Sequence, residues 1–309
     1  MNFDHETTKL DFIKHRKKFF IFSGVMVILS IVLLSTVGLN LGIDFKSGTT
    51  IDILTDAPPV SEAQIAAEFE EIGLVPDDIT LAGDNNEIGR AVFIGVLNQS
   101  ETLQVQSHFE EIYGNEPAVS NVTPMVGEEL ARNAIISVLI AAVGIIIYVT
   151  IRFEFTYGVS AIVALFHDAL LILVVFSIFR FEVNIPFIAA VLTIIGYSIN
   201  DTIVTFDRIR ENIKLEKRVK DFNDVARVVN KSLVQTLARS INTVLTVVFA
   251  AGALFFFGGE ALRSFSFALV VGLVAGTYSS LFLAAQLWLV LKSKQLEKQK
   301  KRPLQESEA

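Results

Sequence analysis

The sequence predicts an α-helical multi-pass membrane bundle of six transmembrane helices, with an inserted ferredoxin-like α+β domain on the extracytoplasmic side. Three observations predict this fold class. The 309 residues are 52% hydrophobic and only 19% charged, which is more apolar surface than one soluble core could bury. Six apolar stretches are long enough, at about 17 to 25 residues, to cross a membrane as helices. Basic residues gather on one side of these stretches.

The first span is predicted at residues 19–38, after a basic segment at residues 1–18. A basic start before an apolar run is also typical of a signal peptide, but this run is about 20 residues long and lacks a small-x-small cleavage site. We therefore expect an uncleaved anchor. The other spans are predicted at residues 133–151, 159–179, 185–206, 241–257 and 265–291. They make up segment 132–291, which includes a cytoplasmic loop at 207–240 and is followed by a tail at 292–309. Residues 207–220 carry charges of both signs and are predicted as a solvated helix that continues from the fourth span.

Lysine and arginine residues give the orientation of these spans. They are frequent in the N-terminal segment, the 207–240 loop and the tail, and with six spans these three segments lie on the same side. An excess of Lys and Arg is typical of cytoplasmic segments. We therefore expect both termini to be cytoplasmic. On the other side, residues 39–131 carry only Lys46 and Arg90 among many acidic residues.

Residues 39–131 contain no apolar run long enough to span a membrane, so we expect them to fold in water. Residue alternation predicts strands at 49–54, 78–81, 88–96 and 118–125, and helical periodicity predicts helices at 61–72 and 101–113, with Ser61 as the cap of the first. The resulting βαββαβ order fits a split-βαβ, ferredoxin-like sandwich. We interpret its acidic residues as a solvated face rather than a cation site.

Polar residues inside the apolar spans carry the functional hypothesis, because an ionisable side chain there costs about 3 kcal/mol. In the fourth span, Tyr197, Ser198 and Thr205 lie three or four residues from Asp201 and share its helical face. Asp201 is either a proton-exchanging carboxylate or a structural one that hydrogen-bonds two helices together. We favour the first, because amides or hydroxyls join helices without the cost of a charge.

A second polar face enters the fifth span. Its members recur at helical spacing and are Gln235, Arg239, Asn242, Thr243 and Thr246. This spacing predicts that a cation and amides face Asp201 across a helix contact. Arg239 is equally consistent with a basic anchor whose side chain extends to the membrane edge.

Two further features lie in the third and last spans. His167 and Asp168 are neighbours that point in different directions on a helix. They are either a second proton-relay point, because histidine titrates near neutral pH, or interior packing residues with local hydrogen bonds, which we favour slightly. Gly272 and Gly276 match the small-xxx-small pattern, which predicts the close approach of another helix.

Several function classes are excluded by the residues themselves. The absence of cysteine excludes disulfides and thiolate metal sites, and the four histidines lack ligand spacing. The α+β segment shows no nucleophile–base arrangement and no phosphate-binding loop. We therefore predict a protein that is not an enzyme, needs no metal or cofactor and binds no nucleic acid.

Three segments resemble signature segments of the SecF proteins, which belong to the SecD/SecF family of bacterial protein-export subunits. They are Gly42 to Thr49 after the first span, Val126 to Leu130 before the second, and Gly196 to Asn212 in and after the fourth. With the six-span layout, the resemblance covers nearly the whole chain. Ser47 departs from the pattern, because the family usually has a second glycine there. A serine at a position that needs a positive φ would be strained, but we expect little consequence because Gly48 remains.

The resemblance implies a multi-pass protein of the bacterial inner (cytoplasmic) membrane. It implies a pairing with SecD and an association of that pair with the SecYEG channel, where the proton-motive force assists a translocating preprotein after the step driven by SecA. By position, Asp201 matches the intramembrane aspartate of the family and Arg239 the arginine at the start of the next span. Asn200 and Thr202, which flank Asp201, complete the predicted proton relay.

Two alternatives remain open from the sequence. One is half of a proton-coupled small-molecule exporter, although such exporters usually carry two sets of six spans in one chain. The other is a structural subunit that stabilises a channel without carrying protons. The structural alternative predicts normal function when Asp201 is replaced by a neutral isostere.

Overall fold

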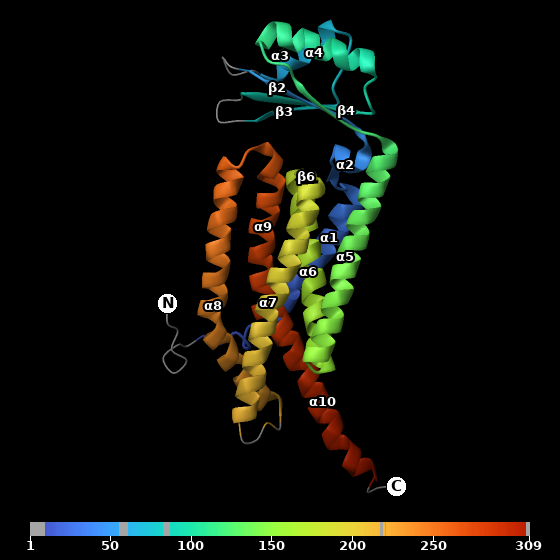
Figure 1. Ribbon diagram of the computed structural model, residues 1–309. Coiled ribbons are helices and arrows are strands. Elements are labelled where there is room, and N and C mark those ends of the chain that lie inside the picture. Colours follow the sequence, from blue (N-terminus) through green and yellow to red (C-terminus); the bar gives the residue numbers. More distant parts are fainter. Residues whose placement is uncertain (1–9, 56–60, 83–86, 217–218, 220, 307–309) are drawn as a thin grey trace.

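The computed structural model describes residues 10–55, 61–82, 87–216, 219 and 221–306 of the chain. Long helices stand side by side in a bundle, and a small α+β domain covers one end of it (Figure 1). Six helices in the described residues are long and apolar enough to cross a membrane, which confirms the predicted number. We refer below to the end of the bundle beneath the α+β domain as the domain end and to the other as the far end.

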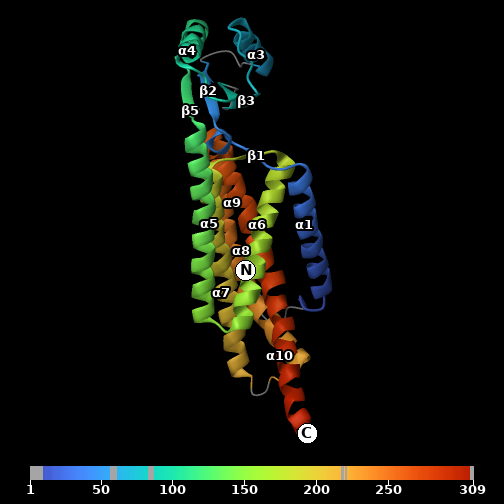
Figure 2. The same ribbon diagram turned by 90° about the vertical axis from the view of Figure 1, so that its right-hand side faces the viewer.

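The spanning helices are longer than their apolar stretches. Their bounds are α1 Arg16–Thr36, α5 Pro124–Arg152, α6 Phe155–Phe179, α7 Ile185–Leu215, α8 Phe222–Phe257 and α9 Glu260–Tyr278, which continues through a π-helical turn, η1 Ser279–Ala284, into α10 Ala285–Glu306. α1 lies along the outer side of the bundle next to α6, as the turned view shows (Figure 2).

Two predicted boundaries change. In the segment 207–240, α7 runs on to Leu215, which agrees with the predicted helical continuation of the fourth span, and α8 already starts at Phe222, where a loop was predicted. Asp221 caps α8 by accepting a hydrogen bond from the backbone N–H of Asp224 at 3.0 Å. At the domain end, α5 begins at Pro124, before the predicted boundary at residue 132, so its first turns stand above the apolar stretch.

The α+β domain has the predicted order of elements. These are β2 Gly48–Leu54, α3 Glu62–Glu71, β3 Asp78–Ala82, β4 Ile88–Ile94, α4 Gln99–Tyr113 and β5 Ala118–Val122. The strands form one antiparallel sheet in the order β3-β4-β2-β5, so each helix connects two strands that have a third strand between them. This is the split-βαβ arrangement. Ser61 caps α3 as predicted, within a reciprocal capping box with Gln64.

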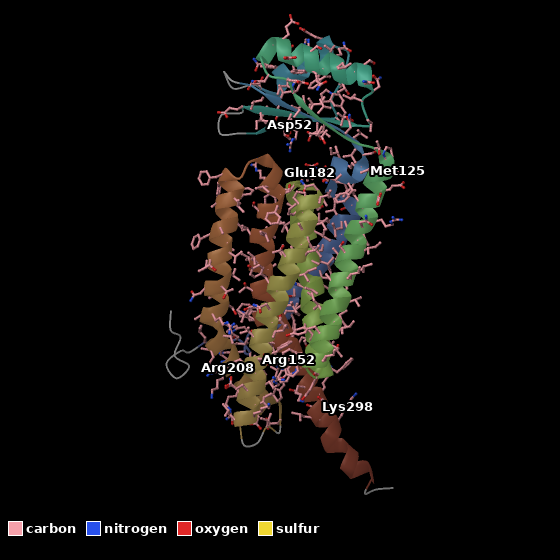
Figure 3. The ribbon with its side chains drawn as sticks, in the orientation of Figure 1. Asp52, Met125, Arg152, Glu182, Arg208 and Lys298 are labelled. Carbon is pink, nitrogen blue, oxygen red and sulfur yellow. The ribbon has the colours of Figure 1, made fainter. Side chains whose placement is uncertain are left out.

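Both domain helices cover the same face of the sheet, away from the bundle (Figure 1). The core between helices and sheet consists of fully buried apolar side chains, among them Ile51, Ile53, Ile65, Phe69 and Phe109. The other face of the sheet looks toward the bundle and carries Asp52, which pairs with Arg90 at 2.6 Å (Figure 3). Both side chains are partly exposed, so this ion pair contributes about 1 kcal/mol or less.

The first connection between bundle and domain is tied to the start of α7. The two-residue strand β1 Asn40–Leu41 pairs in parallel with β6 Glu182–Val183, directly before α7. In the short helix α2 Ile43–Lys46, Asp44 accepts a hydrogen bond from the backbone N–H of Ile185 at 2.9 Å. The start of α7 is therefore hydrogen-bonded directly to the segment that enters the domain.

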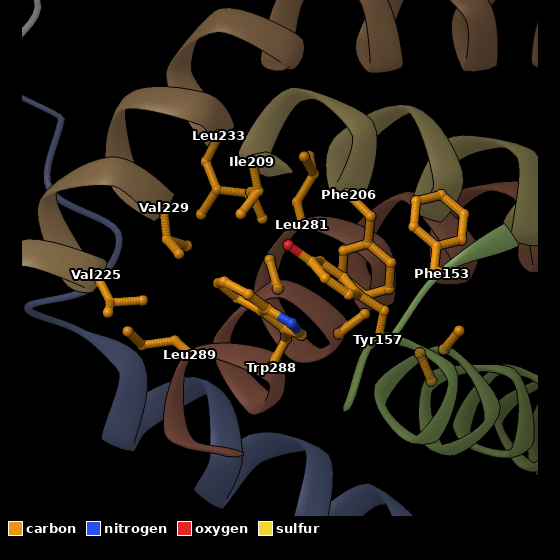
Figure 4. Packing of buried hydrophobic residues seen from close by; sticks show 14 of the residues in the cluster. Phe153, Tyr157, Phe206, Ile209, Val225, Val229, Leu233, Leu281, Trp288 and Leu289 are labelled. Carbon is orange, nitrogen blue, oxygen red and sulfur yellow. The ribbon is translucent and has the colours of Figure 1, made fainter. Parts of the chain in front are cut away.

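The far half of the bundle has its own apolar core. Trp288 is fully buried and stacks on Tyr157 with ring centroids 4.6 Å apart, and Phe206 meets the same tyrosine edge-on at 4.9 Å (Figure 4). Leu233 of α8 and Leu289 of α10 belong to the same cluster. This core joins α6, α7, α8 and α10, so the long extensions of α7 and α8 are packed structure rather than solvated connections.

Candidate functional site

Asp201 lies on α7, partly buried against α8. Its Oδ1 accepts a hydrogen bond from the Ser240 hydroxyl at 2.6 Å. Its Oδ2 is buried and has no hydrogen-bond partner among the residues that the structure describes. A carboxylate with one unsatisfied oxygen is costly to keep in an apolar span, and this arrangement suits a group that exchanges a proton or binds water.

A cavity of about 90 Å³ adjoins Asp201. It is lined from three helices by Tyr197, Ser198, Asn200, Asp201 and Val204 of α7, by Arg239, Thr243 and Val244 of α8, and by Gly272, Leu273, Gly276 and Thr277 of α9. A water molecule needs roughly 10 to 15 Å³ of such volume together with polar partners, so the cavity has room for several waters beside the carboxylate. Hydroxyl, amide and guanidinium groups supply the partners.

Arg239 lines this cavity as predicted, but no ion pair joins it to Asp201 among the described residues. Its side chain is exposed, and its positive charge acts on the carboxylate through space. Arg239 and Val204 also line a second, more open hollow toward the far end, together with Asp207, Arg208, Glu211, Gln235 and Thr236. Arg239 thus stands where the two hollows meet.

The two residues that flank Asp201 point to different places. Asn200 is exposed and lines the cavity. Thr202 is buried on another side of α7, and its hydroxyl lies 2.7 Å from that of Ser280 in the π turn. Neighbours on a helix are turned by about 100°, which separates these side chains. The predicted relay set is therefore divided between the cavity and the interior.

The polar face predicted in the fifth span, which we call the second stripe, is divided in a similar way. Thr243 lines the cavity beside Arg239. Gln235 instead bonds back to α7, accepting from Arg208 Nε at 2.7 Å and from the Asn212 amide at 2.8 Å. Thr246 hydrogen-bonds to the carbonyl oxygen of Thr243 within its own helix. Part of this stripe faces Asp201, and the rest joins the extended parts of α7 and α8.

His167 and Asp168 do not diverge as predicted. Both are buried, and His167 Nδ1 lies 3.3 Å from Asp168 Oδ1. The other carboxylate oxygen accepts hydrogen bonds from the hydroxyls of Ser198 at 2.6 Å and Ser279 at 2.7 Å. The two side chains therefore contact each other, and the same carboxylate is also bonded to α7 and η1. His167 Nε2 is buried without a partner in the part of the chain that the structure describes.

Three serines of the site, Ser240, Ser279 and Ser280, were not among the predicted site residues. Serine is common in membrane helices, so its presence alone carries no signal. Ser240 follows Arg239 directly in the sequence. This position next to a predicted site residue is the one sequence feature that could have indicated its contact with Asp201. Ser279 and Ser280 hydrogen-bond to different helices because they lie in a π turn. No residue pattern in this segment predicts that turn.

In the α+β domain the structure brings Glu68, Glu71 and His108 together, with possible ligand atoms within 4.8 Å of one another. His108 Nε2 lies 2.9 Å from a Glu68 carboxylate oxygen. The same carboxylate and burial raise the pKa of Tyr113, with burial the larger cause. Exposed groups of this kind are common without a metal, so the grouping by itself does not identify a metal site.

Two family models match the chain. One describes the C-terminal part of the protein export membrane proteins SecD and SecF and covers residues 104–294. The other describes the SecD/SecF GG motif and covers residues 32–59, which include Ser47 and Gly48. The chain belongs to the SecD/SecF family. The resemblance seen in the signature segments is thereby confirmed.

The chain matches a small part of one relative and nearly all of another. It is 50% identical over 290 residues to the protein translocase subunit SecDF of Bacillus subtilis, but spans only 39% of that protein. It is 41% identical over 295 residues to the protein translocase subunit SecF of Alicyclobacillus acidocaldarius, and the match covers 94% of this chain and 95% of the relative. The match with this SecF relative therefore extends over nearly the whole length of both sequences.

Solved structures of SecDF share the fold. The chain superposes on the SecDF of Thermus thermophilus, described as a translocon-associated membrane protein, with a TM-score of 0.82 and 34% identity over 93% of this chain and 39% of the other. A super-membrane-facing form of SecDF gives a TM-score of 0.69 at 32% identity over 96% of this chain and 40% of the other. The family fold includes both the helical bundle and the α+β domain.

Proposed function

We propose that this protein is a subunit of the Sec protein translocase that assists protein export together with a SecD-type partner. Its relatives that match end to end are named protein translocase subunit SecF, and six apolar helices make it a multi-pass membrane protein. The partner would join it to the SecYEG channel, where a preprotein moves after the action of SecA. Both termini and the far end of the bundle face the cytoplasm of the bacterial cell in this proposal.

The surface of the bundle supports a helical partner. Arg239, Asn200 and Tyr197 are exposed although they lie in or beside the spans. Polar groups of this kind are unfavourable against lipid and are normally covered by protein or face water. A second six-span unit packed on α7 and α8 would cover them and close the cavity beside Asp201.

We further propose that Asp201 couples the proton-motive force to this work. The single observation that carries the proposal is its partly satisfied carboxylate. One oxygen accepts a hydrogen bond from Ser240, and the other has no partner among the described residues and lies beside a polar cavity. Protonation would remove a charge between α7 and α8 and favour a different packing of the two helices. A proton that crosses about 100 mV yields roughly 2.3 kcal/mol, enough to change a two-state population ratio by more than about tenfold.

The proposed movement has a direct connection to the α+β domain. The first backbone N–H of α7, at Ile185, is bonded to Asp44 of α2, and β6 before α7 is paired with β1. A shift of α7 would therefore pull on the segment that leads into β2. In the proposal the domain holds emerging polypeptide and limits its return.

The test is Asp201→Asn, which keeps the size of the side chain and its bond to Ser240 but cannot exchange a proton. Secretion of a reporter precursor is measured in membrane vesicles with and without an imposed proton gradient, and a pull-down checks that the complex is intact. We expect normal assembly and loss of the gradient-dependent part of secretion. Asp224→Asn, the same change near the start of α8 and away from the cavity, should leave secretion unchanged.

If Asp201→Asn vesicles respond to the gradient as the parent does, Asp201 does not couple protons, and the structural-subunit alternative takes its place. If the complex fails to assemble in the Asp201→Asn variant, Asp201 is a structural residue of the interface, and the coupling proposal is again wrong.

A further inference from the structure

The last span contains a π turn whose residues reach two different helices. In η1, the Ser279 hydroxyl donates to Asp168 Oδ2 of α6 at 2.7 Å, while the hydroxyl of the next residue, Ser280, lies 2.7 Å from the Thr202 hydroxyl of α7. Ser280 also contacts the carbonyl oxygen of Ser198 at 3.3 Å. A π turn widens the helix by about one residue per turn and is often found at functional sites. Here it lets two adjacent serines face the interior.

Asp168 is the centre of this network. Its side chain is 2% exposed. One of its oxygens accepts hydrogen bonds from hydroxyls of two other elements, Ser198 of α7 and Ser279 of η1. Hydrogen bonds to a charged acceptor contribute about 1.5 to 3 kcal/mol each, more than bonds between neutral groups. The carboxylate therefore fastens α7 and the last span to α6 at a single point.

The network fixes the rotation of α7 about its own axis. Ser198 and Thr202 are one turn apart on the same face, and both are bonded to the interior. On the same side Gly276 lies against Ser198, so a Cβ there would be 3.1 Å from the serine Cβ. Asp201 is three residues after Ser198, and its direction toward Ser240 of α8 follows from that of Ser198.

We propose that Asp168 is a positioning residue: its hydrogen bonds to Ser198 and Ser279 hold α7 in the rotation that presents Asp201 to α8 and the cavity. The role depends on accepting hydrogen bonds and not on exchanging a proton. This inference rests on the proposed function of Asp201 for its consequence in export, but its structural part is measurable without export.

Two substitutions separate the positioning role from a relay role. Asp168→Leu has a similar size and removes every acceptor, so α7 should lose its fixed rotation. Asp168→Asn cannot relay a proton but keeps one carbonyl oxygen that both serine hydroxyls can reach. Positioning therefore predicts that Asn rescues what Leu destroys, whereas a relay predicts that both variants fail alike.

The rotation can be read by spin labels, because the chain contains no cysteine. Labels at Thr193→Cys on α7 and Phe249→Cys on α8 stand on exposed positions that do not line the cavity. A sixth of a turn of α7 moves a surface label by about 5 Å, the radius of a helix with its side chains. We expect one narrow distance distribution in the parent and in Asp168→Asn, and a distribution shifted or broadened by about 5 Å in Asp168→Leu.

Controls keep the result decisive if Asp168→Leu is not recovered folded. The Ser198→Ala/Ser279→Ala double variant leaves the carboxylate without its two hydroxyl donors and should show the same change in the label distances. Ser160→Ala is the matched control, because Ser160 is a buried serine on α6 whose hydroxyl, within the part of the chain that the structure describes, bonds only to the carbonyl oxygen of Thr156 in its own helix. Distances in the double variant that equal those of Ser160→Ala would overturn the proposal.

Export distinguishes this inference from the proposed function. We expect Asp168→Asn to keep most gradient-dependent secretion and the serine double variant to lose at least half of it. If Asp168→Asn abolishes the gradient response while the label distances stay those of the parent, Asp168 acts as a proton carrier and the positioning role is wrong. A normal gradient response in Asp201→Asn would refute the coupling by Asp201, while the label distances would still decide the role of Asp168.

Discussion

Adjacent positions in the segment that enters the α+β domain should respond in opposite directions to substitution. Ser47 has φ 63° and ψ 145°, a backbone conformation that residues other than glycine rarely adopt. Gly48, the next residue, has an ordinary backbone, but a Cβ there would overlap the carbonyl oxygen of Phe93 and lie 3.3 Å from Ile43 Cγ2. Ser47→Gly should therefore stabilise the domain, and Gly48→Ala should destabilise it.

The magnitudes follow from backbone strain and steric overlap. The strain of a non-glycine residue in the conformation of Ser47 destabilises the folded state by about 1 to 3 kcal/mol. Glycine removes this strain but loses more conformational entropy on folding, which offsets about 0.5 to 1 kcal/mol of the gain. The net gain of Ser47→Gly is thus about 1 kcal/mol. Gly48→Ala forces strands β2 and β4 apart at their paired ends, and overpacking of this kind costs about 2 kcal/mol.

Hydrogen exchange of the β2 and β4 amides in the full chain is the assay, because it measures local opening of the sheet without dissecting the protein. Exchange should slow about fivefold in Ser47→Gly and accelerate roughly 30-fold in Gly48→Ala. Ser47→Ala keeps the Cβ and should not slow exchange, which separates backbone strain from loss of the hydroxyl. Equal exchange rates in Ser47→Gly and Ser47→Ala would refute the strain argument, and an unchanged rate in Gly48→Ala would refute the overlap.

Further substitutions test the bundle. A Cβ at Gly272 would overlap Ile194 of α7, so Gly272→Ala should lower the thermal stability in detergent. If the contact is direct, adding Ile194→Ala should recover part of this loss, whereas additive losses of the two substitutions would contradict the contact. Trp288→Ala should lower the free energy of unfolding by about 3 to 5 kcal/mol, because the ring is fully buried against Tyr157. Trp288→Phe should lower it clearly less, because the Trp288 Nε1 has no partner in the described structure whose loss would add a cost. Equal losses in the two variants would contradict this account. Arg239→Lys should keep most gradient-dependent secretion because its charge acts through space, whereas Arg239→Gln should lose it; similar secretion from both would contradict the role of the charge.

Several features of the fold could be predicted from local residue patterns. Each span is a continuous apolar run, and lipid requires a helix there because every backbone polar group must be satisfied within the segment. The order of elements in the α+β domain followed from alternation and helical periodicity, and Ser61 caps α3 as its pattern indicates. Patterns within one segment suffice for such predictions.

Helix ends beyond the membrane were predicted less well. The charged extension of α7 was predicted as a solvated helix, and the extension of α8 was predicted as part of a loop. In the structure Ile209 and Val229 are buried in the far core, and Asn212 bonds to Ser232 at 2.8 Å across the two helices. Only contacts between distant segments distinguish a packed helical extension from a loop.

The sequence by itself determined the family, the number of spans, the inserted domain and Asp201 as a costly polar group that needs a reason. It also marked Ser47 as a departure from the family motif for which little consequence was predicted, whereas the positive φ of this residue is a finding of the structure. Only the tertiary structure decided that Thr202 faces Ser280, that Ser240 is the partner of Asp201, and that Asp168 joins three elements. The physical reason is that helical periodicity fixes directions within a helix, whereas the rotation of one helix against another is set by contacts between side chains that lie far apart in the sequence.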